Sequence, residues 1–393
     1  MKLIREDISA DIQKRIDTIR LKIKSEGLDA ILLASNSNIF YTSGRLFRGY
    51  VYITPEHLAL YFVVRPLSVD TSDDTIILRK PELIPSILKE KGMPLPKRLG
   101  LEFDDLYYSE ITRLQAAFPE ATAENCSHLL RKVRMVKTQW ELDCMRYDGL
   151  RQASAYRRFS KCYREDMTDV EFQIEIERLL RLEGCLGYIR TSGSQMEINM
   201  GSVIAGDNAD APSPYDFTMG GAGVDPSLPV GANGAIMHPG ETVMIDVCGA
   251  FNGYQTDMTR VWKIGEIPAL AEKAHECSRN ILRECEKMAV PGCRVATLYD
   301  KAIEIARNEG LSKYFMGHAQ QAPFIGHGVG IQLNELPVVT SRSRDVFEEN
   351  MTIALEPKFV IPHVGAVGIE NTYIVTPTGL ECITPFPEEI QSL

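Results

Sequence analysis

The stretch IDVCGAFNGYQTDMTR, residues 245–260, decides how the C-terminal part of this 393-residue chain is expected to fold. Two apolar, strand-like runs flank an Asn-Gly pair, and such a pair is the strongest short-range signal of a β-hairpin. A two-residue loop at this pair places Asp246 opposite Thr259. Because side chains alternate between the two faces of a strand, Asp257 then shares a sheet face with Asp246. The sequence therefore predicts two neighbouring carboxylates.

Three more potential metal ligands follow along the chain, and with the first two they form the ordered set Asp246, Asp257, His327, Glu356 and Glu370. Each lies in an apolar strand-like stretch or a glycine-rich turn, where a buried charge is costly unless it is paired or binds a metal. Carboxylates and imidazole are typical ligands of hard or borderline divalent cations. The set predicts a site for two such ions, and hence a metal-assisted hydrolase.

The composition is that of an ordinary globular protein, with 44% hydrophobic and 24% charged residues. A formal net charge of -10 argues against nucleic acid or an anionic membrane as the main partner. The chain has no run of about 18 apolar residues, so we expect no transmembrane helix. Its first residues resemble neither a signal peptide nor a transit peptide. The nine cysteines include no CxxC pair and are expected to be reduced thiols, which fits a cytoplasmic location.

Two domains are expected, over residues 1–135 and 136–393. The first alternates helix and strand, beginning with an amphipathic helix over residues 11–26, and is predicted to be an α/β unit. A basic segment then leads into a long helix. Thr138 and Glu141 form a capping box at the start of that helix, because each side chain can satisfy a backbone amide at the first turn.

The second domain mixes long helices with antiparallel strands, so the overall class is α+β. Helices are expected at residues 269–289 and 296–309, where each is followed by a glycine or a Pro-Gly pair. The segments 352–361 and 366–376 are predicted to form a second strand pair, which carries the two glutamates of the ligand set.

The motifs IDVCGAFNGYQTDMTR, FIGHGVG, ALEP and GIEN, in this order, resemble those of the pita-bread-fold metallopeptidases. That family includes methionine aminopeptidase, aminopeptidase P and prolidase, with creatinase as a relative. The segments GLDAILLASNSNIFYTSG and RMVKTQWELDCMR extend the resemblance over essentially the whole chain and favour the aminopeptidase P, prolidase and creatinase branch. The resemblance implies a smaller α/β creatinase-type N-terminal domain followed by a C-terminal pita-bread domain.

The resemblance also implies roles for the five ligands. Asp246 would chelate a first ion, Asp257 and Glu370 would bridge two ions, and His327 and Glu356 would complete the second. Glu356 would also handle the proton of a water between the ions. Manganese, cobalt, zinc and iron all suit such a mixed oxygen and nitrogen set, and manganese is favoured by the resemblance.

Two further catalytic residues, Tyr254 and Arg260, are predicted because the family places them in the same hairpin motif, GYQTDMTR. Arg260 could equally anchor the hairpin through an ion pair.

Four positions around the predicted site depart from the peptidase pattern. Pro323, Asn334 and Ser213 stand where the family has accessory histidines, and Gly368 stands where it has an arginine. General acid–base assistance contributes roughly 10²- to 10⁴-fold to a rate, so these departures bear directly on the substrate.

The implied reaction is attack of a metal-bound hydroxide on an amide C–N bond. The substrate would be a Xaa-Pro dipeptide, a short peptide with proline in second position, or a small amide-containing metabolite. Two alternatives stay open: a hydrolase or lyase of a non-peptide small molecule on the same fold, and a binding protein that has lost catalysis. The resemblance further implies a homodimer.

Overall fold

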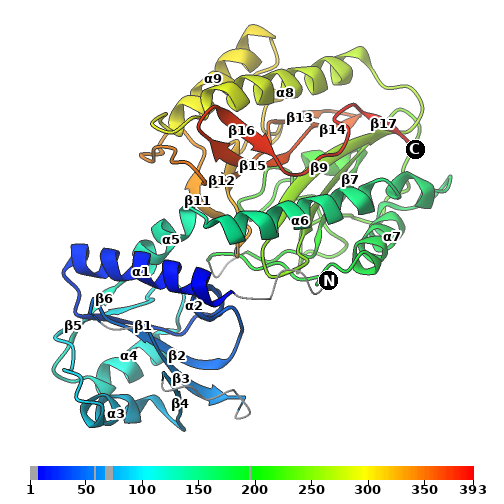
Figure 1. Cartoon of the computed structure of the whole chain (residues 1–393). Helices are drawn as coiled ribbons and strands as arrows, with labels where there is room; N and C mark the ends of the chain where they lie inside the picture. Colours follow the sequence, from blue (N-terminus) through cyan, green and yellow to red (C-terminus); the bar gives the residue numbers. More distant parts are fainter. Residues whose placement is uncertain (1–7, 57–58, 67–73, 194–195) are drawn as a thin grey trace. The chain divides into compact units, whose positions relative to one another are not determined.

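The computed structural model describes residues 8–56, 59–66, 74–193 and 196–393 (Figure 1). The chain forms two compact units, one ending at Arg134 and one spanning Met135–Leu393. Among the described residues, no helix combines the length and apolar character needed to cross a membrane.

The N-terminal unit is built on a six-stranded mixed sheet with the strand order β4-β3-β2-β1-β5-β6. Its central strand β1 pairs antiparallel with β2 and parallel with β5. Side chains of α3 and α4 share one core with alternate residues of the central strands. The elements are α1 (Ser9–Glu26), β1 (Ala30–Leu33), α2 (Asn36–Ser43), β2 (Arg48–Ile53), β3 (Leu60–Arg65), β4 (Thr75–Ile77), η1 (Pro81–Leu83), α3 (Ile84–Glu90), β5 (Arg98–Leu101), α4 (Tyr108–Ala117), β6 (Thr122–Asn125) and α5 (Ser127–Met135).

The C-terminal unit contains a four-stranded sheet, a five-stranded sheet and a two-stranded ribbon, in the orders β17-β9-β8-β7, β11-β10-β12-β15-β16 and β13-β14. Its helices are α6 (Gln139–Tyr156), η2 (Phe159–Cys162), α7 (Asp169–Leu182), η3 (Gly206–Asp210), α8 (Ala269–Met288) and α9 (Ala296–Asn308). Its strands are β7 (Gly201–Ala205), β8 (Thr242–Gly249), β9 (Thr256–Lys263), β10 (Gly326–Gly328), β11 (Glu335–Val338), β12 (Thr352–Leu355), β13 (Lys358–Ile361), β14 (Gly365–Gly368), β15 (Asn371–Thr376), β16 (Gly379–Cys382) and β17 (Gln391–Ser392).

Two helix pairs cover these strands from different sides (Figure 1). One core joins α8 and α9 to β12, β13 and β15, and includes Ile281 and Phe359. A second core joins α6 and α7 to β7, β8 and β9, and includes Phe172 and Trp262. The strands between the pairs are therefore buried on both faces, which makes any charge among them expensive unless it is compensated.

The local signals in the sequence correctly predicted how several helices begin and end. Thr138 accepts from the amide of Glu141 while the Glu141 carboxylate accepts from the amide of Thr138, so the predicted capping box opens α6. The helix predicted over residues 11–26 is α1, and it ends at Gly27 with a left-handed φ of 69°.

The two strands predicted at residues 352–361 and 366–376 are each interrupted, which corrects the sequence-based expectation. The first divides at Glu356 and Pro357 into β12 and β13, and the second divides at Ile369 and Glu370 into β14 and β15. Pro357 has no N–H with which to continue a ladder. The segments also pair differently, because β12 joins β15 while β13 joins β14. Both glutamates therefore lie at junctions between strands.

Candidate metal centre

The hairpin β8–β9 places the two aspartates as the sequence predicts. Asp246 lies opposite Thr259, and Cys248 lies opposite Asp257, with no bulge between these pairs. The Asn-Gly loop carries Gly253 at a φ of 104°, a conformation that favours glycine. Because Asp257 is two residues from Thr259, both carboxylates project from the same face of the sheet.

The other three predicted ligands come from neighbouring strands of the same unit. His327 is the middle residue of β10, which pairs with β12. Glu356 donates its backbone N–H to Ile325 across a 2.9 Å bond, and Glu370 donates its own to Thr259 across 3.2 Å. These bonds tie the strand junctions to β9 and to Ile325, the residue before β10. The structure therefore brings all five residues together.

The five side chains meet at one wall of a cavity of about 560 Å³ that lies wholly within the C-terminal unit. Four of the five line it, whereas Glu370 is 1% exposed and lies behind them. The rest of the wall is mostly apolar and includes Met196, Ile198, Phe217, Met219, Phe324, Leu333 and Val338. This size and lining suit a small molecule or a short peptide.

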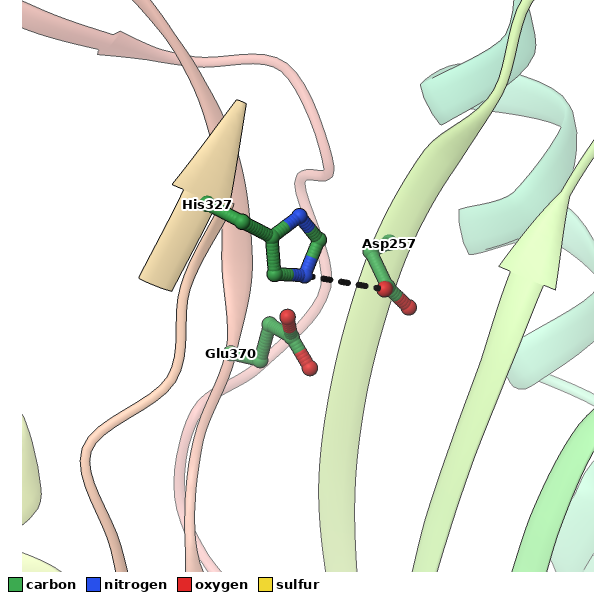
Figure 2. Close-up of side chains that lie close together, drawn as sticks. All are labelled: Asp257, His327 and Glu370. Atoms are coloured by element: carbon green, nitrogen blue, oxygen red, sulfur yellow. Dashed lines mark ion pairs between the residues drawn. The ribbon is translucent and has the colours of Figure 1, made fainter. Parts of the chain in front are cut away.

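One part of the centre, the His327 half, consists of Asp257, His327 and Glu370, from which one ligand atom each can be chosen within 4.8 Å of the others (Figure 2). His327 Nε2 lies 3.9 Å from Asp257 Oδ2 and 3.8 Å from Glu356 Oε1. His327 Nδ1 lies 3.0 Å from the carbonyl oxygen of Gly328, which can only accept, so Nδ1 is the donor there. Nε2 consequently faces the carboxylates, and it is the ring atom that is placed to bind a metal.

The other part, the Lys358 half, consists of Asp246, Glu356 and Glu370 around the ammonium group of Lys358. Lys358 Nζ donates to Asp246 Oδ2 at 2.8 Å, to Glu356 Oε2 at 2.9 Å and to Glu370 Oε2 at 3.1 Å. Its side chain is 0% exposed. Thr218 Oγ1 lies 3.2 Å from the same nitrogen and itself donates to Glu356 Oε2 at 2.8 Å.

The charges of the centre are only partly balanced by its own residues. Burial and the neighbouring Asp246 carboxylate raise the pKa of Asp257 to about 7, against the opposing influence of His327 and Lys358. Burial, followed by Asp257, raises the pKa of Glu370 well above its usual range. Burial lowers the pKa of Lys358, but the carboxylates around it outweigh that effect and raise the pKa well above the ordinary value. Three of the four carboxylates thus surround one firmly charged ammonium.

The donor set fits one divalent ion in the His327 half. Glu370 Oε1 is buried and has no hydrogen-bond partner among the described residues, a costly state that a bound cation would relieve. The same set does not fit a second ion in the Lys358 half, because the ammonium already occupies the position between those three carboxylates. The predicted pair of bridged ions therefore disagrees with this arrangement.

Tyr254 and Arg260, which are predicted to be catalytic, do not line the cavity. Their side chains instead bind neighbouring segments of the chain. The Tyr254 hydroxyl donates to Glu141 at 3.0 Å, and its fully buried ring packs edge-on against Trp140. The Arg260 guanidinium donates to backbone carbonyls, including that of Glu370 at 2.8 Å. Among the residues that the structure describes, Arg260 is held by these carbonyls and by Asn371 Oδ1 rather than by an ion pair. Any influence of these two residues on catalysis would pass through the groups that they position.

The accessory positions differ in what they contact. Pro323 and Asn334 line the cavity, and Asn334 accepts from the amide of Ser192 at 2.6 Å. The Ser213 amide donates to Gln320 at 2.9 Å. At Gly368, φ is 127°, and an added Cβ would lie 2.6 Å from the Pro357 carbonyl oxygen, so an arginine side chain does not fit there in this conformation.

Lys358 is a charged residue of the centre that was not predicted from the sequence, and neither was its neighbour Thr218. A signal was present, because Lys358 is the single charged residue in the apolar run of residues 357–362 and stands two positions after Glu356. A lone lysine in a strand that is buried on both faces requires compensating carboxylates, just as the ligand set requires cations.

Comparison with known proteins gives a match over each unit. Residues 143–377 match the profile of metallopeptidase family M24, and residues 15–136 match the creatinase/prolidase N-terminal domain. The chain is 25% identical over 367 residues to the Xaa-Pro dipeptidase of Pyrococcus horikoshii. The aligned region covers 92% of this chain and 94% of that protein. It is 23% identical over 387 residues to the Xaa-Pro dipeptidase of Pyrococcus furiosus, covering 96% and 100%.

Solved structures show the same fold. The Xaa-Pro dipeptidase from Bacillus anthracis aligns with a TM-score of 0.81 at 23% identity, over 97% of this chain and 100% of that one. The X-Pro aminopeptidase from Thermotoga maritima aligns with a TM-score of 0.76 at 21% identity, over 96% and 99%. The expected architecture, a creatinase-type N-terminal domain followed by a pita-bread domain, is confirmed.

Proposed function

The chain belongs to metallopeptidase family M24, and on that premise we propose that it hydrolyses the amide C–N bond of a Xaa-Pro dipeptide or of a short peptide with proline in second position. The two Pyrococcus relatives, both named Xaa-Pro dipeptidase, support this substrate class. Residues 136–393 would form the catalytic domain, and residues 1–135 the creatinase-like N-terminal domain.

The observation that carries the proposal is the convergence of Asp246, Asp257, His327 and Glu356 on the wall of one apolar cavity, with Glu370 directly behind. A carboxylate cluster without a cation function would be a large electrostatic cost at this depth. The cavity beside it has room for a substrate of two or three residues.

Asp257, His327 and Glu370 would hold a divalent ion, with manganese favoured over cobalt, zinc and iron by the family resemblance. Such an ion, when bound, lowers the pKa of its water toward about 7 and polarises a substrate carbonyl. Glu356 Oε2 is engaged by Lys358 and Thr218, which leaves Oε1, on the side of His327, as the atom that takes a proton. The apolar wall would exclude competing water.

A second candidate function is supported by the accessory positions. Pro323 and Asn334 line the cavity where the resemblance leads us to expect histidines, so the usual proton donors for a leaving amine are replaced. A non-peptide amide with a better leaving group would need less assistance from such donors. A small amide-containing metabolite is therefore the alternative substrate.

Two further features belong to the proposal. We infer a homodimer from the family resemblance. We infer a cytoplasmic location from the cysteines, all nine of which are free thiols, as expected for a reducing compartment.

The test is steady-state hydrolysis of a matched panel of Xaa-Pro dipeptides and Xaa-Pro-Xaa tripeptides by Mn²⁺-loaded protein, with Asp257→Asn as the control variant. Turnover of one length class by the wild type, lost in the variant, would support the proposal and identify the class. If metal-loaded wild-type protein turned over no member of the panel, the Xaa-Pro assignment would be wrong and the small-amide alternative would take its place.

A further inference from the structure

Lys358 occupies the Lys358 half in the manner of a bound cation. Its Nζ has three protons to donate, and three carboxylates, those of Asp246, Glu356 and Glu370, lie within 3.1 Å. These are the same three acids whose ligand atoms converge as one of the two candidate metal-binding groups. The ammonium thus lies where the second ion of a bridged pair would be expected.

The backbone keeps this ammonium in place. Lys358 opens β13 and pairs directly with Gly368 of β14. Gly368 approaches so closely that an added Cβ would lie 2.8 Å from the Lys358 Cα. The amide of Gly368 donates to His275, and that of the next residue donates to Ser278, both on α8. The strand that carries Lys358 is therefore held in place by β14, whose end is hydrogen-bonded to α8. The lysine side chain itself is fully buried.

A divalent ion and the ammonium cannot share this position. Metal–oxygen bonds to carboxylates are about 2.0–2.2 Å long, so an ion bound by the same three acids would lie almost in contact with Nζ. The two positive charges would repel strongly in a site with little water. A fully buried side chain also has no solvent into which it could withdraw.

The charge balance leads to the same result. Asp246, Asp257, Glu356 and Glu370 bring a formal charge of -4, and Lys358 brings +1. One divalent ion would leave a formal charge of -1, so a single ion already offsets most of the charge of the acids. Two divalent ions together with the ammonium would exceed the formal charge of the four acids by one, so no second ion is needed to offset them.

We propose that Lys358 is a built-in second cation, so that each chain binds a single divalent ion, in the His327 half. This inference rests on the proposed metal-dependent function. Lys358 and Asp246 are then positioning residues: the ammonium orients Glu356 and Glu370 toward the ion, and Asp246 holds the ammonium rather than an ion.

The decisive experiment measures bound metal. Wild-type protein, Lys358→Gly, Asp246→Asn and Asp257→Asn are dialysed to equilibrium against Mn²⁺ or Co²⁺, and the ions per folded chain are counted by elemental analysis. We expect one ion in the wild type, one in Asp246→Asn, and none in Asp257→Asn. Removing the lysine side chain in Lys358→Gly should open the second position and give two ions.

An electron paramagnetic resonance spectrum supplies a second readout. A lone Mn²⁺ is expected in the wild type and an exchange-coupled Mn²⁺ pair in Lys358→Gly. Two ions in the wild type, none in the wild type, or a lost ion in Asp246→Asn would each overturn the inference. If Lys358→Gly did not fold, the wild-type and Asp246→Asn counts together would decide, because a bridged pair gives two ions in the wild type and loses one in the variant, whereas a single-ion centre gives one ion in both.

Ion counts do not depend on turnover, so the two proposals fail separately. Protein that binds one ion but hydrolyses no peptide would refute the Xaa-Pro assignment and keep the single-ion centre. Protein that hydrolyses Xaa-Pro peptides with two ions bound would keep the function and refute the role of Lys358.

Discussion

The His327 half and the Lys358 half both contain buried carboxylates, but they differ in the cation that offsets the negative charge. Both gather carboxylates between buried strands, and they share Glu370. In the His327 half the Nε2 atom of an imidazole faces the acids, and their charge remains available for an ion. In the Lys358 half a tethered ammonium already compensates that charge. What stands opposite the acids, rather than the acids themselves, decides whether a carboxylate cluster binds a metal.

The two halves also differ in how far they are exposed to solvent. The His327 side chain is 15% exposed and lines the cavity, so an exchangeable ion and a substrate can both reach it. Lys358 is 0% exposed and lies behind the wall. A fixed cation belongs on the buried side, because it cannot dissociate and offers no open position to a substrate.

The largest expected effect follows from the one aspartate that only the His327 half contains. Asp257→Asn removes a charged ligand from the ion while leaving the contacts of Lys358 in place. We expect the bound ion to be lost and kcat/KM to fall by roughly 10³-fold, at the upper end for one electrostatic stabiliser. Metal content and turnover of the preferred substrate test this. Retained turnover with an ion still bound would place the reactive ion elsewhere.

The Lys358 half is tested by Lys358→Met, which keeps most of the length of the side chain and removes its charge. Removing one partner of a buried ion pair typically costs about 3–5 kcal/mol of folding free energy, and we expect a loss of this size in metal-free protein. Urea unfolding in the presence of a chelator measures it. Wild-type stability in this variant would show that the ammonium does not compensate the surrounding carboxylates.

Much of this centre could be predicted from local sequence, and the part that could not depends on distant contacts. The Asn-Gly turn sets the pairing of the residues on either side of it, so local sequence is enough to place Asp246 and Asp257 on one sheet face. Lys358 acquires its role from pairing with Gly368 and from the break at Pro357, which no local periodicity indicates. The two-ion prediction rests on the acids alone, without the cation that the fold places among them.

A second histidine, His275, is predicted to affect stability without binding an ion. It supports Gly368, the strand partner of Lys358, by accepting the Gly368 amide at Nδ1, while Nε2 donates to the carbonyl of Glu388 at 2.7 Å. Burial, helped by the nearby Arg279, lowers the pKa of His275 to about 4. With both nitrogens occupied, the folded protein has no place for another proton.

The sign of the pH dependence follows from that pKa. The unfolded chain takes up the proton near pH 6.5 and the folded chain only near pH 4, so stability present above pH 6.5 is lost as the pH falls toward 4. The loss amounts to roughly 3 kcal/mol. The free energy of unfolding in urea, measured between pH 7 and pH 4, should fall by about this amount more in the wild type than in His275→Gln. An equal loss of stability in both proteins would exclude His275 as the cause of the pH dependence.

The smallest effect is expected outside both halves, at Asn334. Its side chain accepts from the Ser192 amide at 2.6 Å and donates to the Ser192 carbonyl at 3.0 Å, so it holds one segment of the cavity wall. Asn334→Ala should cost about 1 kcal/mol of stability, as for a typical hydrogen bond, and leave the ion count unchanged. We expect kcat/KM to fall by less than about tenfold relative to the wild type. Asp257→Asn, measured in the same assay, is the comparison. A loss as large as that of Asp257→Asn, with the ion retained, would instead assign Asn334 the substrate contact that a histidine was expected to make.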